Sequence, residues 1–295
     1  MAITAAMVKE LRERTGAGMM ECKQALTDAG GDMDAAVGTL RKKGAAKADK
    51  KAGRIAAEGA IASASSGDGG AAALVEVNCE TDFVAKDENF AAYVKAVAET
   101  VLRRRPADLE ALKRAPLEGV DTTVDEARVE LISKIGENLD VRRFAVLDAD
   151  AGGRIDNYLH GSRIGVLVKL RGGAEPLGRD VAMHVAASRP LCIDKDAVPA
   201  ETLAKEREIY QSQAQESGKP AEIVAKIVDG KVQKYINEIT LLGQPFVKDP
   251  EQSVGKLLGA QGAEVMDFVR FEVGEGLEKR EDDFVAEVMA QAKGA

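Results

Sequence analysis

The hydrophobic positions at the start of the chain recur at helical spacing and predict three short helices. Ile3, Met7 and Leu11 share one face of the first helix, which Thr4 can cap and Gly16 can stop. The three expected spans are about residues 3–16, 18–29 and 32–44. Three helices in so few residues make a small bundle that has little stability of its own.

Residues 42–54, rich in Lys and Ala, are expected to form a solvated linker, helical or not. We therefore assign residues 1–54 to an N-terminal three-helix bundle with its linker. This segment holds eleven Lys or Arg against seven Asp or Glu, a balance of +4 in a chain whose net charge is −8. The basic end is suited to an acidic partner or surface.

From residue 55 the pattern changes to strands interspersed with helices. Two apolar runs on either side of the turn-like residues 66–70 predict a β-hairpin. An amphipathic helix, a second helix and an apolar strand follow. The expected elements are strands over 60–64, 71–77 and 141–147 and helices over 87–104 and 123–135.

The same order recurs in the second half of the chain. A hairpin around residues 160–163, a helix and a closing strand predict a second sheet related to the first. A helical pair is inserted, with a break before Pro220, because proline can start a helix but not continue one. The expected elements are strands over 155–159, 164–170 and 268–273 and helices over 177–188, 199–216, 220–239 and 282–291.

These elements predict an α+β fold with a small N-terminal three-helix bundle, two related α+β core subdomains, an inserted helical hairpin and a C-terminal helix. The expected boundaries are residues 1–54, 55–150, 151–275 with the hairpin at about 199–239, and 276–295. A helical hairpin of this kind often projects and pairs with another surface, so self-association through it is one hypothesis.

Composition narrows the class of protein. The 295 residues are 45% hydrophobic and 31% charged, which is typical of a soluble protein with a core. No apolar run approaches the ~20 residues of a membrane span, and no signal peptide is apparent. Three separated cysteines without a CxxC pattern predict free thiols and a cytoplasmic location. The negative net charge makes nucleic-acid binding an unfavourable interpretation.

The most informative local signal follows the apolar run 71–77. Polar residues end this run, and one large ring, Phe83, stands among them between Asp82 and Val84. A ring on a tight polar turn is well placed to enter a pocket of another protein. The alternative is a core ring that closes the corner between strand and helix, and residue physics alone slightly favours this alternative.

Met19 and Met20 raise the same question in the second helix. Each is a core residue by default, but two adjacent residues cannot both face inward on one helix. We therefore expect at least one exposed Met, a side chain that adapts well to a partner surface.

Candidate chemistry within the chain is sparse. No GxxxxGK[ST] or GxGxxG loop, no HExxH and no zinc or EF-hand spacing occurs, so no nucleotide or metal site of its own is expected. Cys79, Asp82 and His160 lie at strand ends and define a thiol-nucleophile hypothesis, which is weak because nothing local lowers the pKa of the thiol. His184 lies in mid-helix and is expected to be packed.

Two further alternatives remain open. Asp82, with Glu80 and Asp87 nearby, suggests metal ligands, although Asp87 also fits the N-cap of the next helix. A basic linker can also contact RNA, against the simpler interpretation of a solvated segment. The basic residues concerned are Lys42, Lys43, Lys47, Lys50, Lys51 and Arg54.

Several segments, in order from end to end, resemble the bacterial elongation factor Ts family. The first reads Leu-Arg-Glu-Arg-Thr-Gly-Ala-Gly-Met-Met at residues 11–20, and the second reads Glu-Val-Asn-Cys-Glu-Thr-Asp-Phe-Val-Ala-Lys at residues 76–86. Further similar segments lie at residues 160–166, 183–187, 243–247 and 270–276. The resemblance implies a ubiquitin-associated-like bundle, a two-part core, a helical hairpin and a C-terminal helical module.

The resemblance also implies a function, guanine-nucleotide exchange on elongation factor Tu during translation, with no cofactor and no enzymatic bond chemistry. Residues 81–84 are implied to enter the GTPase domain and displace its Mg²⁺. A neighbouring contact is implied for His160, and another for the final helix around Phe284. The wedge residues are Thr81, Asp82, Phe83 and Val84, and the bundle residues implied to grip the same domain are Arg12, Met19, Met20 and Lys23.

Overall fold

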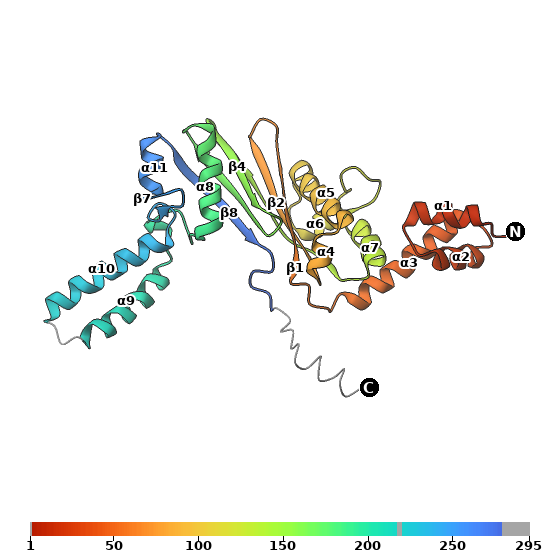
Figure 1. The fold of residues 1–295 in the computed structure, drawn as a ribbon, viewed down its shortest axis with the longest axis horizontal. Coiled ribbons are helices and arrows are strands. Elements are labelled where there is room, and N and C mark those ends of the chain that lie inside the picture. The colour runs from red at the N-terminus through yellow and green to blue at the C-terminus, as the bar shows by residue number, and fades with distance from the viewer. Residues whose placement is uncertain (1, 217–219, 279–295) are drawn as a thin grey trace.

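The fold is α+β, as the sequence predicts. The structure, a computed structural model, describes residues 2–216 and 220–278. Figure 1 shows an elongated molecule with an N-terminal helical bundle at one end, a layered core in the middle and a helical hairpin at the other end.

The bundle consists of α1 (Ala5–Thr15), α2 (Met19–Asp28) and the first part of α3 (Met33–Lys51). The predicted caps are confirmed: the side chain of Thr4 accepts a hydrogen bond from the backbone N–H of Met7, and Asp32 accepts one from Ala35. Gly16 ends α1 with a left-handed φ of 64°. The buried core of the bundle consists of Leu11, Cys22, Ala25, Leu26, Ala36 and Leu40.

Helix α3 does not stop at Gly44, so the predicted end of the third helix is wrong, and the segment from residue 42 takes the helical alternative. The helix continues to Lys51, and Gly44 and Ala48 are buried. A Cβ built on Gly44 would lie 3.6 Å from the side chain of Val129, so this face of α3 lies close against helix α7 (Val124–Ile135). Packing on α7 compensates for the roughly 1 kcal/mol by which glycine disfavours a helix interior. One continuous helix therefore joins the bundle to the core.

Two three-stranded antiparallel sheets form the centre of the core. The first has the order β1 (Glu58–Ser65), β2 (Ala71–Cys79), β3 (Leu139–Asp148), and the second β4 (Gly153–His160), β5 (Ile164–Arg171), β8 (Glu264–Glu272). A buried cluster lies between them, and Gly165 has no room for a side chain because a Cβ there would come within 2.6 Å of Ile61 and Leu74. The cluster contains Ile61, Ala72, Leu74, Ile155, Leu167, Phe271 and Val273.

Helices cover the outer face of each sheet, giving four layers in the order helix, sheet, sheet, helix (Figure 1). Helix α5 (Glu88–Arg104) packs its predicted stripe on the first sheet, helped by α7 and by α6 (Leu109–Arg114), which was not predicted. Helix α8 (Glu175–Ser188) covers the second sheet. The stripe of α5 consists of Phe90, Val94, Val97 and Val101, all buried.

The inserted hairpin is confirmed as α9 (Ala200–Gln215) and α10 (Ala221–Ile239). Its small cluster centres on Ala214, Val228 and Val232. Four short elements in the second half of the described residues were not predicted: η1 (Lys195–Ala197), β6 (Pro245–Phe246), β7 (Asp249–Ser253) and α11 (Val254–Ala260).

The C-terminal helix predicted over residues 282–291, with Phe284, lies outside the described residues. The assignment of the chain to four domains stays a prediction. Within residues 2–216 and 220–278, no helix is both long and apolar enough to cross a membrane.

Candidate partner-docking site

The corner after β2 turns one apolar residue inward and one outward. Thr81 caps a single helical turn, α4 (Asp82–Ala85), by accepting a hydrogen bond from the backbone N–H of Val84 at 3.4 Å. Val84 is buried, whereas 81% of Phe83 is exposed. The core interpretation of Phe83 is therefore wrong. A side chain of this size so exposed is a feature that protein contacts use.

A carboxylate from another segment holds this corner. Glu137 Oε2 accepts hydrogen bonds from the backbone N–H groups of Glu80 (3.1 Å) and Thr81 (3.0 Å), and its Oε1 accepts one from the Thr81 hydroxyl at 2.7 Å. In return, Glu80 Oε1 accepts a hydrogen bond from the backbone N–H of Asn138 at 2.6 Å. We call these four bonds the Glu137 clamp. Sequence reasoning missed Glu137, which follows the end of α7 with no local pattern to mark it.

Asp82 lies beside the exposed ring and is itself exposed. Its carboxylate pairs with Lys86 at 2.7 Å, and this hydrogen bond lowers the pKa of Asp82 below its ordinary value. Asp87 caps α5 by accepting from Asn89 and Phe90. The metal-ligand hypothesis finds no support, because no cluster of three or more potential ligands occurs among the described residues.

The thiol-nucleophile hypothesis is contradicted at Cys79. This residue is fully buried, and its Sγ donates a hydrogen bond to the backbone carbonyl of Thr81 at 3.1 Å. Burial, with the nearby charge of Glu137 as a further cause, raises the pKa of the Cys79 thiol to about 12. A thiol of that pKa is protonated at neutral pH and is no nucleophile.

His160 is exposed at the end of β4, where its Nδ1 lies 3.1 Å from the hydroxyl of Tyr158. The turn that follows is tied to the start of β1: Arg163 pairs with Glu58 at 2.6 Å. Because Glu58 lies opposite Cys79 in the first sheet, this turn is at the same end of the double sheet as the Phe83 corner. The structure thus brings two distant predicted contacts to one end of the core.

The bundle presents the remaining predicted residues. Met19 and Met20 are 61% and 74% exposed, which confirms the expectation of at least one exposed Met and shows that the default core interpretation is wrong for both. Both stand in the first turn of α2, outside the bundle core. Arg12 on α1 and Lys23 on α2 are exposed as well. The bundle therefore offers two adaptable apolar side chains with basic neighbours.

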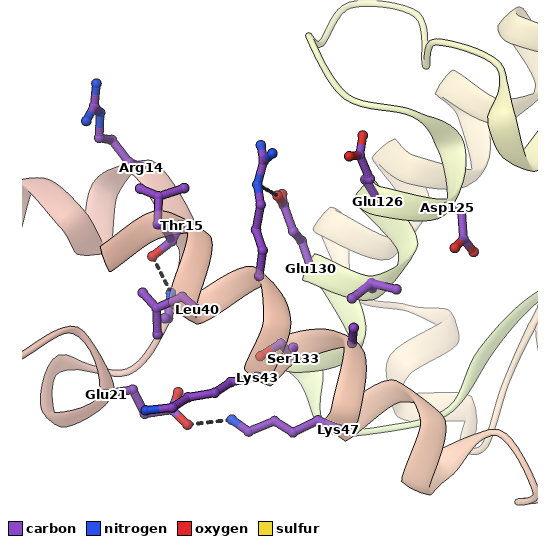
Figure 2. A pocket seen from close by; sticks show the side chains of 16 residues that line it. Arg14, Thr15, Glu21, Leu40, Lys43, Lys47, Asp125, Glu126, Glu130 and Ser133 are labelled. Carbon is purple, nitrogen blue, oxygen red and sulfur yellow. Dashed lines mark hydrogen bonds and ion pairs between the residues drawn. The ribbon is translucent and has the colours of Figure 1, made fainter. Parts of the chain in front are cut away.

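A crevice of about 250 Å³ lies where the bundle meets the core, between α3 and α7. Figure 2 shows that charged side chains reach across its rim from both sides. Arg41 on α3 approaches Glu130 on α7 at 4.0 Å, and partial burial raises the pKa of Glu130. The crevice is lined by these charged side chains and by Val37, Leu40 and Val129. We interpret it as the interface between the bundle and the core.

The basic residues of α3 are largely engaged within the chain, which disfavours RNA binding. Lys47 pairs with Glu21, Lys43 approaches Asp28 at 3.8 Å, and Lys51 donates to the backbone carbonyl of Gly136. Two of these lysines are paired with carboxylates and the third is held by a backbone carbonyl, so their side chains are less available to bind phosphate.

Taken together, the exposed ring and the exposed Met pair give the surface expected of the class of proteins that dock on other proteins. Residues 80–275 match the family model described as Elongation factor TS. The similarity to individual relatives extends over the whole chain, so the chain belongs to the elongation factor Ts family, a family of translation elongation factors.

Three relatives illustrate the degree of similarity. Elongation factor Ts of Thioalkalivibrio sulfidiphilus is 62% identical over 295 residues, and that of Methylococcus capsulatus is 60% identical over 295 residues, each alignment covering 100% of both chains. Elongation factor Ts of Legionella pneumophila (strain Paris) is 55% identical over 291 residues, or 99% of each chain.

Proposed function

We propose that this protein is a guanine-nucleotide exchange factor that binds GDP-bound elongation factor Tu and promotes GDP release by displacing Mg²⁺. The observation that carries the proposal is the 81% exposed Phe83 on a clamped corner, in a chain that belongs to this family. Translation elongation is cytoplasmic, so the proposal includes a cytoplasmic location.

Burial of the Phe83 ring in a partner pocket can supply a useful share of the binding free energy. Burying a Phe side chain contributes about 1.5–3 kcal/mol, or roughly a factor of 10 to 100 in an equilibrium constant. In the free protein this apolar surface faces water, so the energy is released only when a partner pocket covers it. Val84 is already buried in the core and anchors α4 there.

Displacement of Mg²⁺ follows from where the corner enters. Mg²⁺ neutralises the phosphates of bound GDP, and the GTPase's own loop amides cradle them. In the proposed complex, Phe83 inserts beside that metal site and Asp82 brings a carboxylate with it. The inserted residues shift an element that holds the metal, and GDP loses much of its electrostatic attraction. No covalent bond changes, so the process accelerates dissociation without being an enzymatic reaction.

The other contacts are proposed to align the wedge. His160, at the same end of the double sheet, contacts a neighbouring patch of the GTPase domain. The exposed Met pair of α2, with Arg12 and Lys23, grips that domain near its nucleotide pocket. Phe284 adds a contact from the C-terminal segment, and the α9–α10 hairpin, with Ile209 and Ile223 about half exposed, is the candidate for self-association.

Thermodynamic linkage sets a condition on this function. If the protein weakens GDP binding by some factor, it must bind the nucleotide-free GTPase more tightly than the GDP form by the same factor. Affinity for the two forms is therefore an independent check on any measured acceleration.

The direct test is release of a fluorescent GDP analogue from purified elongation factor Tu, in the presence of Mg²⁺ and excess unlabelled GDP. A substoichiometric amount of this protein is expected to accelerate release strongly and in a saturable way. Chelation of Mg²⁺ serves as the positive control, because it shows that the loaded GTPase can release its nucleotide. With that control positive, no acceleration by this protein would overturn the proposal.

The same assay separates exchange from Mg²⁺ displacement. If displacement is the mechanism, the acceleration is large in Mg²⁺ and shrinks after chelation, because the metal's contribution is then already lost. An acceleration of equal size under both conditions would refute the Mg²⁺ step while leaving the exchange function in place.

A further inference from the structure

Glu137 lies at the end of the first sheet, where backbone pairing between β2 and β3 stops. The last pair between β2 and β3 is Cys79 with Leu139. The next two N–H groups, of Glu80 and Thr81, would have no strand to bond to, since residues 136–138 turn away towards α7. The side chain of Glu137 supplies the missing acceptors at 3.1 and 3.0 Å, and thus continues the ladder beyond its end.

The third bond of the carboxylate extends this support into the turn that carries Phe83. The Thr81 hydroxyl donates to Glu137 Oε1 at 2.7 Å and accepts from the backbone N–H of Val84 at 3.4 Å. A charged acceptor therefore holds a hydroxyl that in turn caps α4. Hydrogen bonds to a charged group are about twice as strong as neutral ones, so the bond from Thr81 to Glu137 strongly restrains the residue that caps α4.

Glu137 is itself held from both sides. The backbone N–H of Gly136 bonds to the carbonyl of Ile132 at 2.8 Å and ends α7 in a left-handed conformation with φ 90°. On the other side, the N–H of Asn138 bonds to Glu80, and its side-chain amide bonds to the carbonyl of Arg54 at 2.9 Å. A fixed backbone aims the carboxylate without further ordering when a partner arrives.

We propose that Glu137 is a positioning residue for the docking ring: its carboxylate presents Phe83 in one orientation before the partner binds. This inference rests on the proposed exchange function and goes one step further, because it assigns a role to a residue that acts through hydrogen bonds within the chain. Pre-organisation of this kind raises the productive fraction of encounters by removing an ordering cost from binding.

The first experiment measures the corner directly in the free full-length protein, by amide hydrogen–deuterium exchange of the peptide covering residues 78–86. Glu137→Ala is expected to speed exchange at residues 80–84 by roughly tenfold or more, since three hydrogen bonds are lost, two of them from backbone amides. Exchange in α5 and β5 stays unchanged. Glu110→Ala is the matched control, because Glu110 is exposed on α6 and pairs only with Lys113 in the described part of the chain. Unchanged exchange at residues 80–84 in Glu137→Ala would overturn the proposal.

The second experiment is a double-mutant cycle on the rate of GDP release from elongation factor Tu. Glu137→Ala is expected to lower kcat/KM by roughly tenfold in the wild-type background and by less than about twofold in the Phe83→Ala background, because a positioning residue has nothing left to position. Equal losses in both backgrounds would mean that Glu137 acts independently of the ring, and would refute the proposal.

Glu137→Gln keeps the size of the side chain and one acceptor oxygen, so it provides a second variant if the alanine protein folds poorly. Its amide exchange at residues 80–84 and its kcat/KM for GDP release are both expected to lie between those of the wild type and those of Glu137→Ala. The two failures can be told apart: wild-type protein that releases no GDP overturns the proposed function, while the hydrogen–deuterium comparison still decides whether Glu137 holds the corner.

Discussion

Each α+β half of the core contains two residues of the same type, one exposed to solvent and the other buried. In the first half, Phe83 is 81% exposed and Phe90, only seven positions later, is fully buried. In the second half, His160 is exposed at the end of β4 and His184 is fully buried. In both halves the exposed member stands at the same end of the double sheet, and the buried member faces inward from a covering helix. Position on the layered core, and not residue type, separates the exposed residues from the core residues.

The largest effect is expected at the buried phenylalanine. Phe90→Ala removes a ring from the main core cluster, and such a change costs about 3–5 kcal/mol of unfolding free energy. Urea unfolding measures it, and the exchange rate per folded molecule should stay close to wild type. A loss of less than about 1 kcal/mol would show that α5 packs less tightly than its burial indicates.

A smaller effect, on function, is expected at His160. His160→Ala removes an exposed ring beside Tyr158, so thermal stability should hardly change, while GDP release slows by roughly threefold to tenfold. The rate of release and the melting temperature are measured on the same sample. Should the melting temperature fall with the rate unaffected, His160 would belong with the structural residues and the comparison between the two halves would fail.

The smallest expected effect is a pH dependence at His184. Val247 donates its backbone N–H to Nδ1 at 3.1 Å, so Nε2 carries the proton that bonds to Gln244 at 3.0 Å, and the ring is neutral. Burial lowers the pKa of His184 below its unfolded value of about 6.5. The unfolded chain therefore binds more protons below that pH, and stability falls as the pH drops from 7.5 to 6.

His184→Gln removes this titration while keeping a polar side chain. Urea unfolding at pH 7.5 and 6 should show a smaller pH dependence for His184→Gln than for the wild type, with His160→Ala serving as the matched control. An identical pH dependence in all three proteins would mean that the buried histidine does not titrate in this range.

Much of the fold could be predicted because its signals are local. Thr4, Asp32 and Asp87 cap the helices that they precede, and the apolar stripe of α5 packs inward as its spacing indicates. The stop at Gly44 failed for a tertiary reason: contact with α7 outweighs a weak local preference.

The site was less predictable. Whether Phe83 or Val84 turns inward depends on one turn of helix, whose cap at Thr81 is held by a carboxylate 56 positions away. No periodicity in the sequence relates Thr81 to Glu137. Similarity to a family identified the segment 81–84. The exposure of Phe83 and the Glu137 clamp could be seen only in the three-dimensional structure.

The most direct test of the account is to measure GDP release and unfolding side by side for Phe83→Ala and the wild type. If Phe83 enters the partner, kcat/KM for release falls at least tenfold, because that apolar surface is lost, while the free energy of unfolding changes by less than about 0.5 kcal/mol. A strongly destabilised variant that still releases GDP at the wild-type rate per folded molecule would contradict it, because Phe83 would then serve the protein's own core and not its partner.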